Sequence, residues 1–341
     1  PPPLSLINTL FNYLYEKDIH IALLQETYCT EAFKETFDKD WNGSVFHSFA
    51  PTCHSKGVCT CILISDKVVF NINSTHCDED GRRILLNISI DDSDFSIVNV
   101  YCPNNTLDRI SFLKNCTKWY LEKTNCNNTI CGGDFNCSFY KKDRKNGKLC
   151  NKSAYSLKCF IKSLNLADVW HNCNKNKIEY TYIDPSNRNR DSRIDFLFLS
   201  NTICKDVLKC SINPAPVPDH NTVTCEINMC QNIRGPGYWK LNNSILDDHD
   251  YISGINDLIE KTCDDYHDVD KKLVWELIKI RIKEFSINYC TKISKVRKSK
   301  IFILETKLKN LEHDDLQRKV IKDELNILYS SLYKGAQSRS R

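Results

Sequence analysis

The sequence predicts an α/β protein of two packed mixed β-sheets flanked by helices, followed by an all-α extension. In the first two thirds of the chain, segments with apolar residues three and four apart alternate with short β-branched runs. This alternation is too irregular for a doubly wound sheet, so two packed sheets with helices outside them fit better. Beyond it only helical periodicity is found. We therefore expect one domain at residues 1–228, a linker at 229–240 that contains Arg234-Gly235-Pro236-Gly237, and a helical region at 241–341.

Each expected element follows from its local pattern. The first helix, residues 4–15, has Leu6, Leu10 and Leu14 on one face. Later helices are expected at residues 31–38, 107–123 and 153–164. Strands are expected at residues 20–24, 58–64, 84–90, 95–101, 194–199 and 222–227, and one more begins at residue 129. In the extension, apolar residues recur at helical spacing in two places: Leu273, Leu277 and Ile280, and Ile321, Leu325, Leu328 and Leu332.

The composition restricts the class of protein. Of the 341 residues 41% are hydrophobic, and no apolar run reaches the roughly 18 residues that a membrane span requires, so no membrane anchor is expected. The start, Pro1-Pro2-Pro3, has neither the features of a secretory signal nor a Met, which suggests a fragment. The 19 Cys include no Cys-x-x-Cys pair, which favours buried free thiols of an intracellular protein over a zinc site or a disulfide framework.

The net charge of +4 is unevenly distributed. Residues 291–341 hold 13 Lys and Arg against 6 Asp and Glu, a net +7, which leaves −3 for residues 1–290. Five basic residues occur there with no acid between them: Lys292, Lys295, Arg297, Lys298 and Lys300. They indicate a segment that contacts nucleic acid, or the solvated face of a helix.

Polar side chains occur where several predicted strands end. Gly132-Gly133-Asp134-Phe135-Asn136 closes the strand that begins at residue 129, and alternation on a strand would direct Asp134 and Asn136 to one side. The two glycines permit a tight exit or the close approach of a ligand, although an ordinary strand-end turn would use the same residues. Comparable strand ends carry Glu26, Asp195 and Asp219-His220. Together these groups suit metal-assisted hydrolysis of a phosphodiester, with Mg²⁺ held by one or two carboxylates plus water and phosphate.

These motifs resemble, in their order along the chain, those of the endonuclease/exonuclease/phosphatase superfamily, which includes exonuclease III-like AP endonucleases and DNase I. The segments that carry the resemblance are Leu24-Gln25-Glu26-Thr27, Tyr101-Cys102-Pro103-Asn104, Gly133-Asp134-Phe135-Asn136, Ser192-Arg193-Ile194-Asp195 and Asp219-His220. The resemblance implies a four-layer, DNase I-like α/β sandwich. It is closest to the endonuclease domain of LINE-type non-LTR retrotransposon polyproteins.

The resemblance also implies roles for individual residues. Glu26 would bind Mg²⁺, for which Mn²⁺ can substitute, and Asp219 is a candidate second ligand. Asp134 would orient or deprotonate the attacking water, and Asn136 would hold the phosphate in the transition state. The remaining roles concern the phosphate and its acid–base partner. His220 would contact the scissile phosphate or act as the acid–base group with Asp195 fixing its tautomer, while Tyr101 and Asn104 would position the phosphate.

Other features connect the chain with a polyprotein. The segments at residues 237–242 and 334–341 look like the connector that precedes the reverse transcriptase in such polyproteins, and no Tyr/Phe-x-Asp-Asp motif of a polymerase occurs. Double-stranded DNA is the expected substrate, element RNA a further partner of the basic region, and the nucleus the expected site of action. The alternatives are a stand-alone AP endonuclease of DNA repair and an inactive retroelement fragment that only binds nucleic acid.

Two departures from the superfamily pattern bear on activity. The strand that normally precedes the first helix, and ends in an Asn that helps to bind the metal, is replaced by Pro1-Pro2-Pro3. The pocket would then lack one ligand and the sheet one strand. Pro218 replaces the Ser that usually precedes Asp-His, which removes a backbone donor beside His220.

Overall fold

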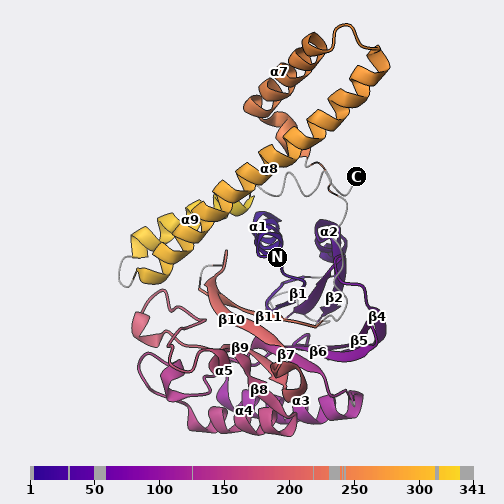
Figure 1. The fold of residues 1–341 in the computed structure, drawn as a ribbon. Helices are drawn as coiled ribbons and strands as arrows, with labels where there is room; N and C mark the ends of the chain where they lie inside the picture. Colours follow the sequence, from indigo (N-terminus) through magenta and orange to yellow (C-terminus); the bar gives the residue numbers. More distant parts are fainter. Residues whose placement is uncertain are drawn as a thin grey trace. The chain divides into compact units, whose positions relative to one another are not determined.

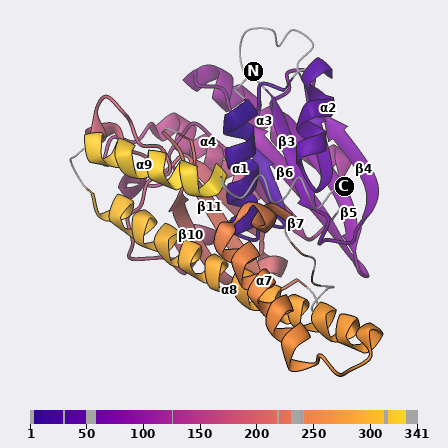
Figure 2. The same cartoon turned by 90° about the horizontal axis from the view of Figure 1, so that it is seen from above.

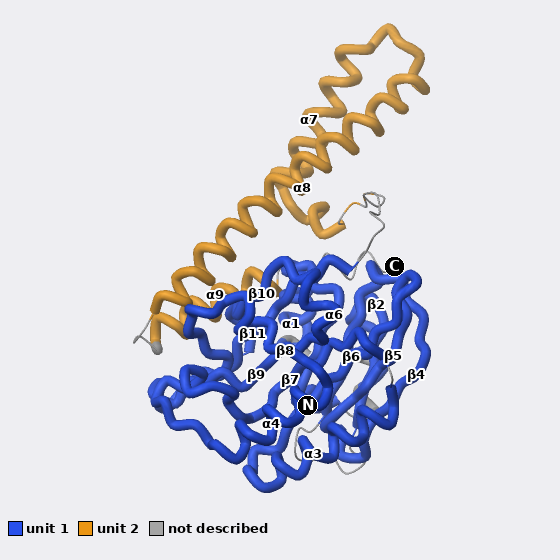
Figure 3. The backbone as a smooth tube through the Cα atoms, turned by 60° about the horizontal axis from the view of Figure 1, so that its bottom comes forward, with its two compact units in different colours: residues 1–233 blue, residues 234–341 orange. Residues whose placement is uncertain are grey.

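The structure is a computed structural model that describes residues 4–29, 31–49, 59–124, 126–217, 219–229, 239, 241, 243–311 and 315–330. The chain divides into two compact units, Pro1–Ile233 and Arg234–Arg341, which Figure 3 distinguishes by colour. The expected linker, residues 229–240, is described only at 229 and 239. Pro218, residues 237, 238, 240 and 242 of the first connector segment, and all of residues 334–341 also lie outside the described residues.

A six-stranded sheet forms the centre of unit 1 (Figure 1). Only β6 and β7 run parallel, and the other neighbours are antiparallel, so the sheet is mixed. The strands, in their order across the sheet, are β4 (Asn71–Cys77), β5 (Arg83–Ile90), β6 (Ser93–Tyr101), β7 (Thr129–Asp134), β9 (Asp195–Ser200) and β8 (Leu166–Asp168).

A second layer of strands covers one face of this sheet. It consists of a three-stranded sheet in the order β1–β3–β2 and of the hairpin β10–β11, all antiparallel. Their bounds are β1 (Ile21–Leu24), β2 (Gly43–Ser48), β3 (Thr60–Ser65), β10 (Val207–Pro214) and β11 (Asn221–Ile227). Apolar side chains from both pieces enter one core with the large sheet, among them Ile62 of β3 and Ile212 of β10.

Helices cover the outer faces of both layers (Figure 1), and Figure 2 gives the view from above, onto the helices near the N-terminus. On the large sheet lie α3 (Thr106–Lys123) and α4 (Asn151–Ser163), whose apolar side chains share a core with β6, β7 and β9. On the second layer lie α1 (Leu4–Glu16) and α2 (Glu31–Asp40), which meet through the rings of Phe11, Phe37 and Trp41. The predicted sandwich of two sheets between helices is therefore confirmed, although the second layer is antiparallel rather than mixed.

Short elements complete unit 1. They are the helices α5 (Val169–Cys173) and α6 (Asn201–Cys204) and the 3₁₀ turns η1 (Lys141–Asp143) and η2 (Arg188–Arg190). Sequence patterns did not predict β2, β4, β8 or β10 as strands. The reason is clearest for β4, an edge strand that carries polar side chains on both faces and is largely exposed, so it lacks the apolar alternation that marks a half-buried strand.

Unit 2 is helical, as predicted. A 3₁₀ turn, η3 (Asn243–Asp247), precedes α7 (His249–Asp265), α8 (Lys271–Asn310) and α9 (Asp315–Ser330). The long helix α8 pairs with α7 through Tyr251, whose hydroxyl lies 2.7 Å from the hydroxyl of Ser286, and with α9 through Tyr329, which donates to Glu305 at 2.8 Å. In the described part of the chain no helix is long and apolar enough to cross a membrane.

The cysteines that the structure describes are free thiols. Most of those in the strands of unit 1 are buried, as expected, but several others are exposed: Cys77, Cys150, Cys159, Cys173 and Cys263.

Candidate active site

Three of the predicted site residues lie side by side where strands of the large sheet meet. In the parallel pair β6–β7, Tyr101 is the register partner of Asp134. In the antiparallel pair β7–β9, Asp134 is in turn the partner of Asp195. The hydrogen-bond register alone therefore sets a phenol and two carboxylates in a row across the edge of the sheet.

A pocket of about 490 Å³ opens at this edge. The structure brings seven of the predicted residues to its lining: Glu26, Tyr101, Asn104, Asp134, Asn136, Asp219 and His220. Asp195 does not line the pocket but contacts His220, which does. The predicted basic residues of α8 belong to unit 2 and form no part of this lining.

Backbone strain directs two of these side chains. Strand β7 ends at Asp134, so alternation along a strand is not what brings Asn136 to the pocket. Asn136 instead has a left-handed backbone, with φ +50°, and its N–H donates to Oδ1 of Asp134 at 2.8 Å. Glu26, past the end of β1, is also left-handed, with φ +53°. Such conformations are costly for residues other than glycine and cluster at functional sites.

The two glycines before Asp134 serve packing between strands rather than the approach of a ligand. Gly133 has φ +141°, and a Cβ there would lie 1.9 Å from the carbonyl oxygen of Val100 in β6. A Cβ on Gly132 would meet side chains of Leu197 and Leu23 at 2.7 Å. Because Leu23 comes from β1, Gly132 lets the second layer lie close over β7.

Separate contacts hold Tyr101 and Asn104 in place. The Tyr101 hydroxyl donates to Oε1 of Glu26. Burial, and then the hydrogen bond and negative charge of Glu26, raise the pKa of this phenol, so it remains a donor. The backbone carbonyl of Asn104 accepts from Nη1 of the buried Arg109 at 2.9 Å.

The surroundings of His220 favour the protonated form of its ring. Its Nδ1 lies 3.0 Å from Oδ2 of Asp195, and the ring of Tyr182 packs 5.3 Å from the imidazole, centroid to centroid. Burial alone would lower the pKa of His220, but the charge and hydrogen bond of Asp195, followed by the charges of Asp134 and Asp219, raise it to about 9. The result is an imidazolium at the wall of the pocket.

Asp134 is the most strongly perturbed acid of the site. Burial raises its pKa well above the ordinary value, and the negative charges of Asp195 and Glu26 raise it further. The positive charge of His220 and the N–H of Asn136 oppose this shift without cancelling it. A carboxylate whose pKa is raised in this way is a stronger base than an exposed one, which is the property that water activation requires.

The donor set suits a hard divalent cation. The acids that line the pocket are Glu26, Asp134, Asp184 and Asp219, and oxygen ligands are those that Mg²⁺ prefers. Among the described residues no three acidic, His or Cys side chains come close enough to enclose an ion. A metal here would therefore depend on one or two carboxylates and on oxygens of water and substrate, which agrees with the way Mg²⁺ is usually held at phosphates.

One wall of the pocket was not predicted from the sequence. It is formed by Arg144, Asn146, Tyr182, Asp184, Arg190, Ser192 and Ile194. The buried carboxylate of Asp191 joins the two loops of this wall, because it accepts from the N–H of Asp184 and lies 3.8 Å from Nζ of Lys145. The sequence signal for this wall was the segment rich in Asn, Lys and Arg that precedes β9. The spacing of these residues does not show which side chains turn toward the pocket.

The basic residues of α8 are mostly exposed, as a nucleic-acid-binding face or a solvated face would require. They are Lys292, Lys295, Arg297, Lys298 and Lys300, of which Arg297 is half-buried. One of them has an acidic partner that the sequence did not reveal, since Nζ of Lys300 lies 2.9 Å from Glu324 of α9.

Comparisons with known proteins agree on the fold. No protein-family model matches the chain. An AP endonuclease from Archaeoglobus fulgidus covers 66% of this chain and 95% of its own, with a TM-score of 0.53 at 18% identity. The endonuclease domain of TRAS1, a telomere-specific non-LTR retrotransposon, covers 67% and 95%, with a TM-score of 0.50 at 16% identity. The chain has the endonuclease/exonuclease/phosphatase fold.

A sequence relative extends the likeness beyond this fold. An uncharacterized 149 kDa protein of transposon TX1 from Xenopus laevis is 27% identical in an alignment of 312 residues, which covers 89% of this chain and 23% of that protein. A match over 89% of the chain includes part of unit 2. The predicted resemblance to a retrotransposon-related nuclease of the endonuclease/exonuclease/phosphatase fold is thus confirmed, and the chain spans less than a quarter of the relative's length.

Proposed function

We propose that the chain is a Mg²⁺-dependent endonuclease that nicks double-stranded DNA for target-primed reverse transcription by a non-LTR retrotransposon. The observation that carries this proposal is the pocket into which Glu26, Asp134, Asn136 and His220 all project. These residues come from segments almost 200 positions apart, and together they supply a metal ligand, a base, an amide and a cation. Hydrolysis of a phosphodiester requires this combination.

The side chains divide the work of hydrolysis. Asp134 accepts the proton of the attacking water, because its raised pKa makes it a competent base in a buried site. The positive charge of His220 and the amide of Asn136 stabilise the charge that develops on the phosphate oxygens. Asp195 accepts from Nδ1 of His220, which leaves the Nε2–H directed away from Asp195 as the donor to phosphate.

Glu26 and Asp219 are the residues that would hold Mg²⁺. When bound there, the cation supplies positive charge to the phosphate beyond that of His220. Tyr101 supports this role of Glu26, because its hydroxyl donates to one carboxylate oxygen and limits the orientations of the other.

The connection with a retrotransposon rests on the TX1 relative rather than on the fold. The AP endonuclease and the TRAS1 endonuclease domain each match about two thirds of the chain, whereas the transposon protein matches 89% of it. We propose that unit 2 is a connector to a reverse transcriptase in cis, and that the exposed lysines of α8 bind phosphates of target DNA or element RNA in the nucleus.

Nicking of supercoiled plasmid tests the proposed activity. The full chain is expected to convert supercoiled plasmid to the open circle in Mg²⁺ and not in EDTA. Glu26→Gln is expected to raise the Mg²⁺ concentration for half-maximal rate by about tenfold or more, since it removes a charged ligand and keeps the shape. His220→Ala should lower the rate at saturating Mg²⁺.

A matched substitution and a second substrate separate the alternatives. Lys148→Ala, a change to a surface residue that does not line the pocket, should nick as fast as the parent. A repair AP endonuclease would cut an oligonucleotide with one abasic site far faster than intact plasmid. An inactive fragment would retain DNA on a filter but show no nicking that depends on Mg²⁺ or on His220.

A further inference from the structure

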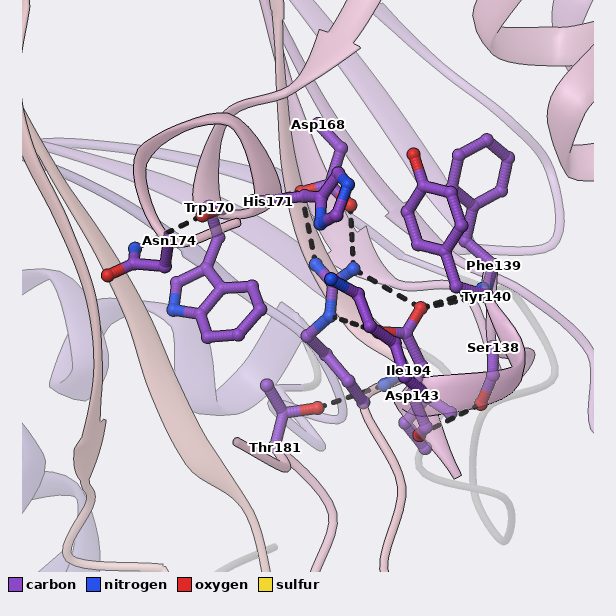
Figure 4. Close-up of polar contacts among 12 residues, drawn as sticks. Ser138, Phe139, Tyr140, Asp143, Asp168, Trp170, His171, Asn174, Thr181 and Ile194 are labelled. Atoms are coloured by element: carbon purple, nitrogen blue, oxygen red, sulfur yellow. Dashed lines mark hydrogen bonds and ion pairs between the residues drawn. The ribbon is translucent and has the colours of Figure 1, made fainter. Parts of the chain in front are cut away.

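The side chain of Arg193 is enclosed near the start of β9 by two acids and two aromatic rings. Its nitrogen atoms donate to Asp143 at 2.9 and 3.2 Å and to Asp168 at 3.0 and 2.7 Å. Its guanidinium carbon lies 4.8 Å from the ring centre of Trp170 and 4.5 Å from that of Phe196. The side chain is 1% exposed. Figure 4 shows Asp143, Asp168 and Trp170 arranged around this point.

This environment selects arginine over lysine. A buried carboxylate is costly unless it is paired and hydrogen-bonded, and here two carboxylates share one cation. Only the planar fork of a guanidinium can donate to both in two places while its faces lie against rings. Both acids also accept backbone N–H groups: Asp143 from Phe139 at 3.3 Å and Tyr140 at 2.8 Å, and Asp168 from His171 at 3.1 Å. The contacts of Arg193 therefore fix backbone as well as side chains.

Part of the backbone that Arg193 fixes adjoins the pocket, because Arg144, Ser192 and Ile194 line it. Asp143 lies in the turn that follows Asn136, and its carbonyl also accepts the N–H of Arg193 at 2.8 Å. Asp168 ends β8 and caps α5. Two residues after Arg193 comes Asp195. The side chain of Arg193 thus connects the turn after β7 and the end of β8 to the start of β9.

Asp195 depends on its backbone for orientation. Among the described contacts its carboxylate bonds only the imidazole of His220, so no second donor fixes it. Its backbone is located by Thr181, whose hydroxyl oxygen accepts the N–H groups of Ile194 and Asp195 at 3.0 and 3.1 Å, and by Arg193. A shift of β9 at this point would move the carboxylate away from Nδ1 of His220.

We propose that Arg193 is a positioning residue of the active site, which holds Asp195 at the place where it orients His220 toward the pocket. The catalytic consequence rests on the proposed nuclease function, whereas the effect on the His220 ring does not. If Arg193 served stability alone, its replacement would lower the melting temperature and leave the geometry of the folded site unchanged.

Arg83 provides a matched control. It too pairs with an acid, Asp78 at 3.4 Å, and lies over two aromatic rings, Phe112 at 5.6 Å and Trp119 at 4.7 Å. None of these four residues lines the pocket. Arg83→Lys therefore removes an ion pair and ring contacts of the same kinds, although Arg83 has one contact with an acid where Arg193 has four hydrogen bonds. Only Arg193→Lys is expected to affect His220.

The experiment uses three measurements on the full chain: thermal unfolding, the nitrogen–proton spectrum of the histidine rings, and the kcat and KM of nicking. His220→Gln identifies the signals of His220 among the nine histidines. Both lysine variants should melt lower than the parent. Only Arg193→Lys should shift the ring signals of His220 and reduce kcat by about tenfold or more with KM for DNA unchanged.

The outcomes separate the two proposals. Unchanged His220 signals in folded Arg193→Lys, or an equal loss of kcat in Arg83→Lys, would overturn the positioning role. If the parent does not nick, the proposed function fails, while the ring spectrum still decides the positioning role. Should Arg193→Lys not fold, Asp168→Asn keeps the arginine and its pair with Asp143, and the same shift of the His220 signals is expected in it.

Discussion

Replacing Asp134 by asparagine should inactivate the protein and stabilise it at the same time. The amide has the size of the carboxylate and can still accept the N–H of Asn136, which bonds Oδ1 at 2.8 Å. It cannot accept a proton from water. The amide also carries no charge. The carboxylate of Asp134, by contrast, is charged, although the residue is only 8% exposed and faces the negative charges of Asp195 and Glu26. Loss of a general base typically costs about 10²- to 10⁴-fold in rate.

The gain in stability follows from the raised pKa of Asp134. The unfolded chain releases this proton at about pH 4, but the folded chain holds it to higher pH because of burial and the neighbouring acids. Between the two pKa values folding takes up a proton, so the parent loses stability as pH rises, and above the folded pKa the loss is complete. Each unit of pKa corresponds to about 1.4 kcal/mol, or about 3–6 °C in the melting temperature of a domain of this size.

Calorimetry of parent and variant in EDTA, at pH 4 and pH 7.5, measures this effect without a bound cation. Asp134→Asn is expected to melt about 3 °C or more above the parent at pH 7.5, and the difference should shrink at pH 4. Nicking is measured beside it at saturating Mg²⁺. A variant that nicks at the parental rate would refute the role of Asp134 as base. A variant with no gain at pH 7.5 would refute the electrostatic argument.

Two further predictions concern the strand before the site and the basic face of α8. Gly133→Ala should cost about 2–5 kcal/mol of stability, because its Cβ would collide with the carbonyl of Val100 in a left-handed backbone. Gly147 is also left-handed, but a Cβ there would meet no atom within 4 Å, so Gly147→Ala should cost only about 1–2 kcal/mol. Denaturant titration measures both costs, and equal costs would contradict a collision at Gly133. Replacing three exposed lysines of α8 by Gln should weaken retention of DNA and reduce the slope of its salt dependence by about 0.9 for each phosphate that a lysine neutralises in the parent. The three are Lys292, Lys295 and Lys298. Lys300→Gln is the control, because the charge that it removes is already paired with Glu324 at 2.9 Å. If all variants retained DNA equally, the lysines of α8 would form a solvated face that does not bind DNA.

The sequence predicted elements well where one face of a segment is buried. The helix at α3 and the strands β5 and β6 fall within one or two residues of the expected ranges, because each carries a continuous apolar pattern against the core. Edge strands escaped prediction. β4 buries little of either face, and β10 contains Asn213 and Pro214, which suggest a break, although both take part in its pairing with β11.

In unit 2 as well, the sequence predicted the elements better than their packing. Helical periodicity predicted that the region is helical, but not that one helix of 40 residues pairs with α7 along one half and with α9 along the other. Its buried residues are Ile278 and Ser286 in the first half and Ile301, Leu304, Glu305 and Leu308 in the second. The partners of an individual lysine depend on this pairing, which is why the contact of Lys300 with Glu324 is absent from the local sequence.

For the pocket, residue types at strand ends and the resemblance to the superfamily named seven of the lining side chains, but not the remaining wall, and not how the side chains meet. Tyr101, Asp134 and Asp195 align through backbone registers that a motif cannot specify. Asn136 reaches the same pocket by a left-handed turn. A local bond holds this turn, from the N–H of Asn136 to Oδ1 of Asp134, and so does a bond from the Asn136 amide to the carbonyl of Cys102, each at 2.8 Å.

Arg193 illustrates why a motif contains more than its reactive groups. In Ser192-Arg193-Ile194-Asp195, the acid contacts the histidine, and the isoleucine carbonyl accepts the N–H of Phe135 at 2.9 Å. The arginine is bound to Asp143 in the turn η1 and to Asp168 at the end of β8. The four positions thus connect β9 to the segment after β7 and to β8, besides supplying one carboxylate. Because Asp134 at the end of β7 and Asp195 at the start of β9 repel each other, the site needs a buried framework that prevents them from moving apart. Arg193 with its two acids provides that framework, and its loss should therefore loosen the geometry of the site before it unfolds the sheet.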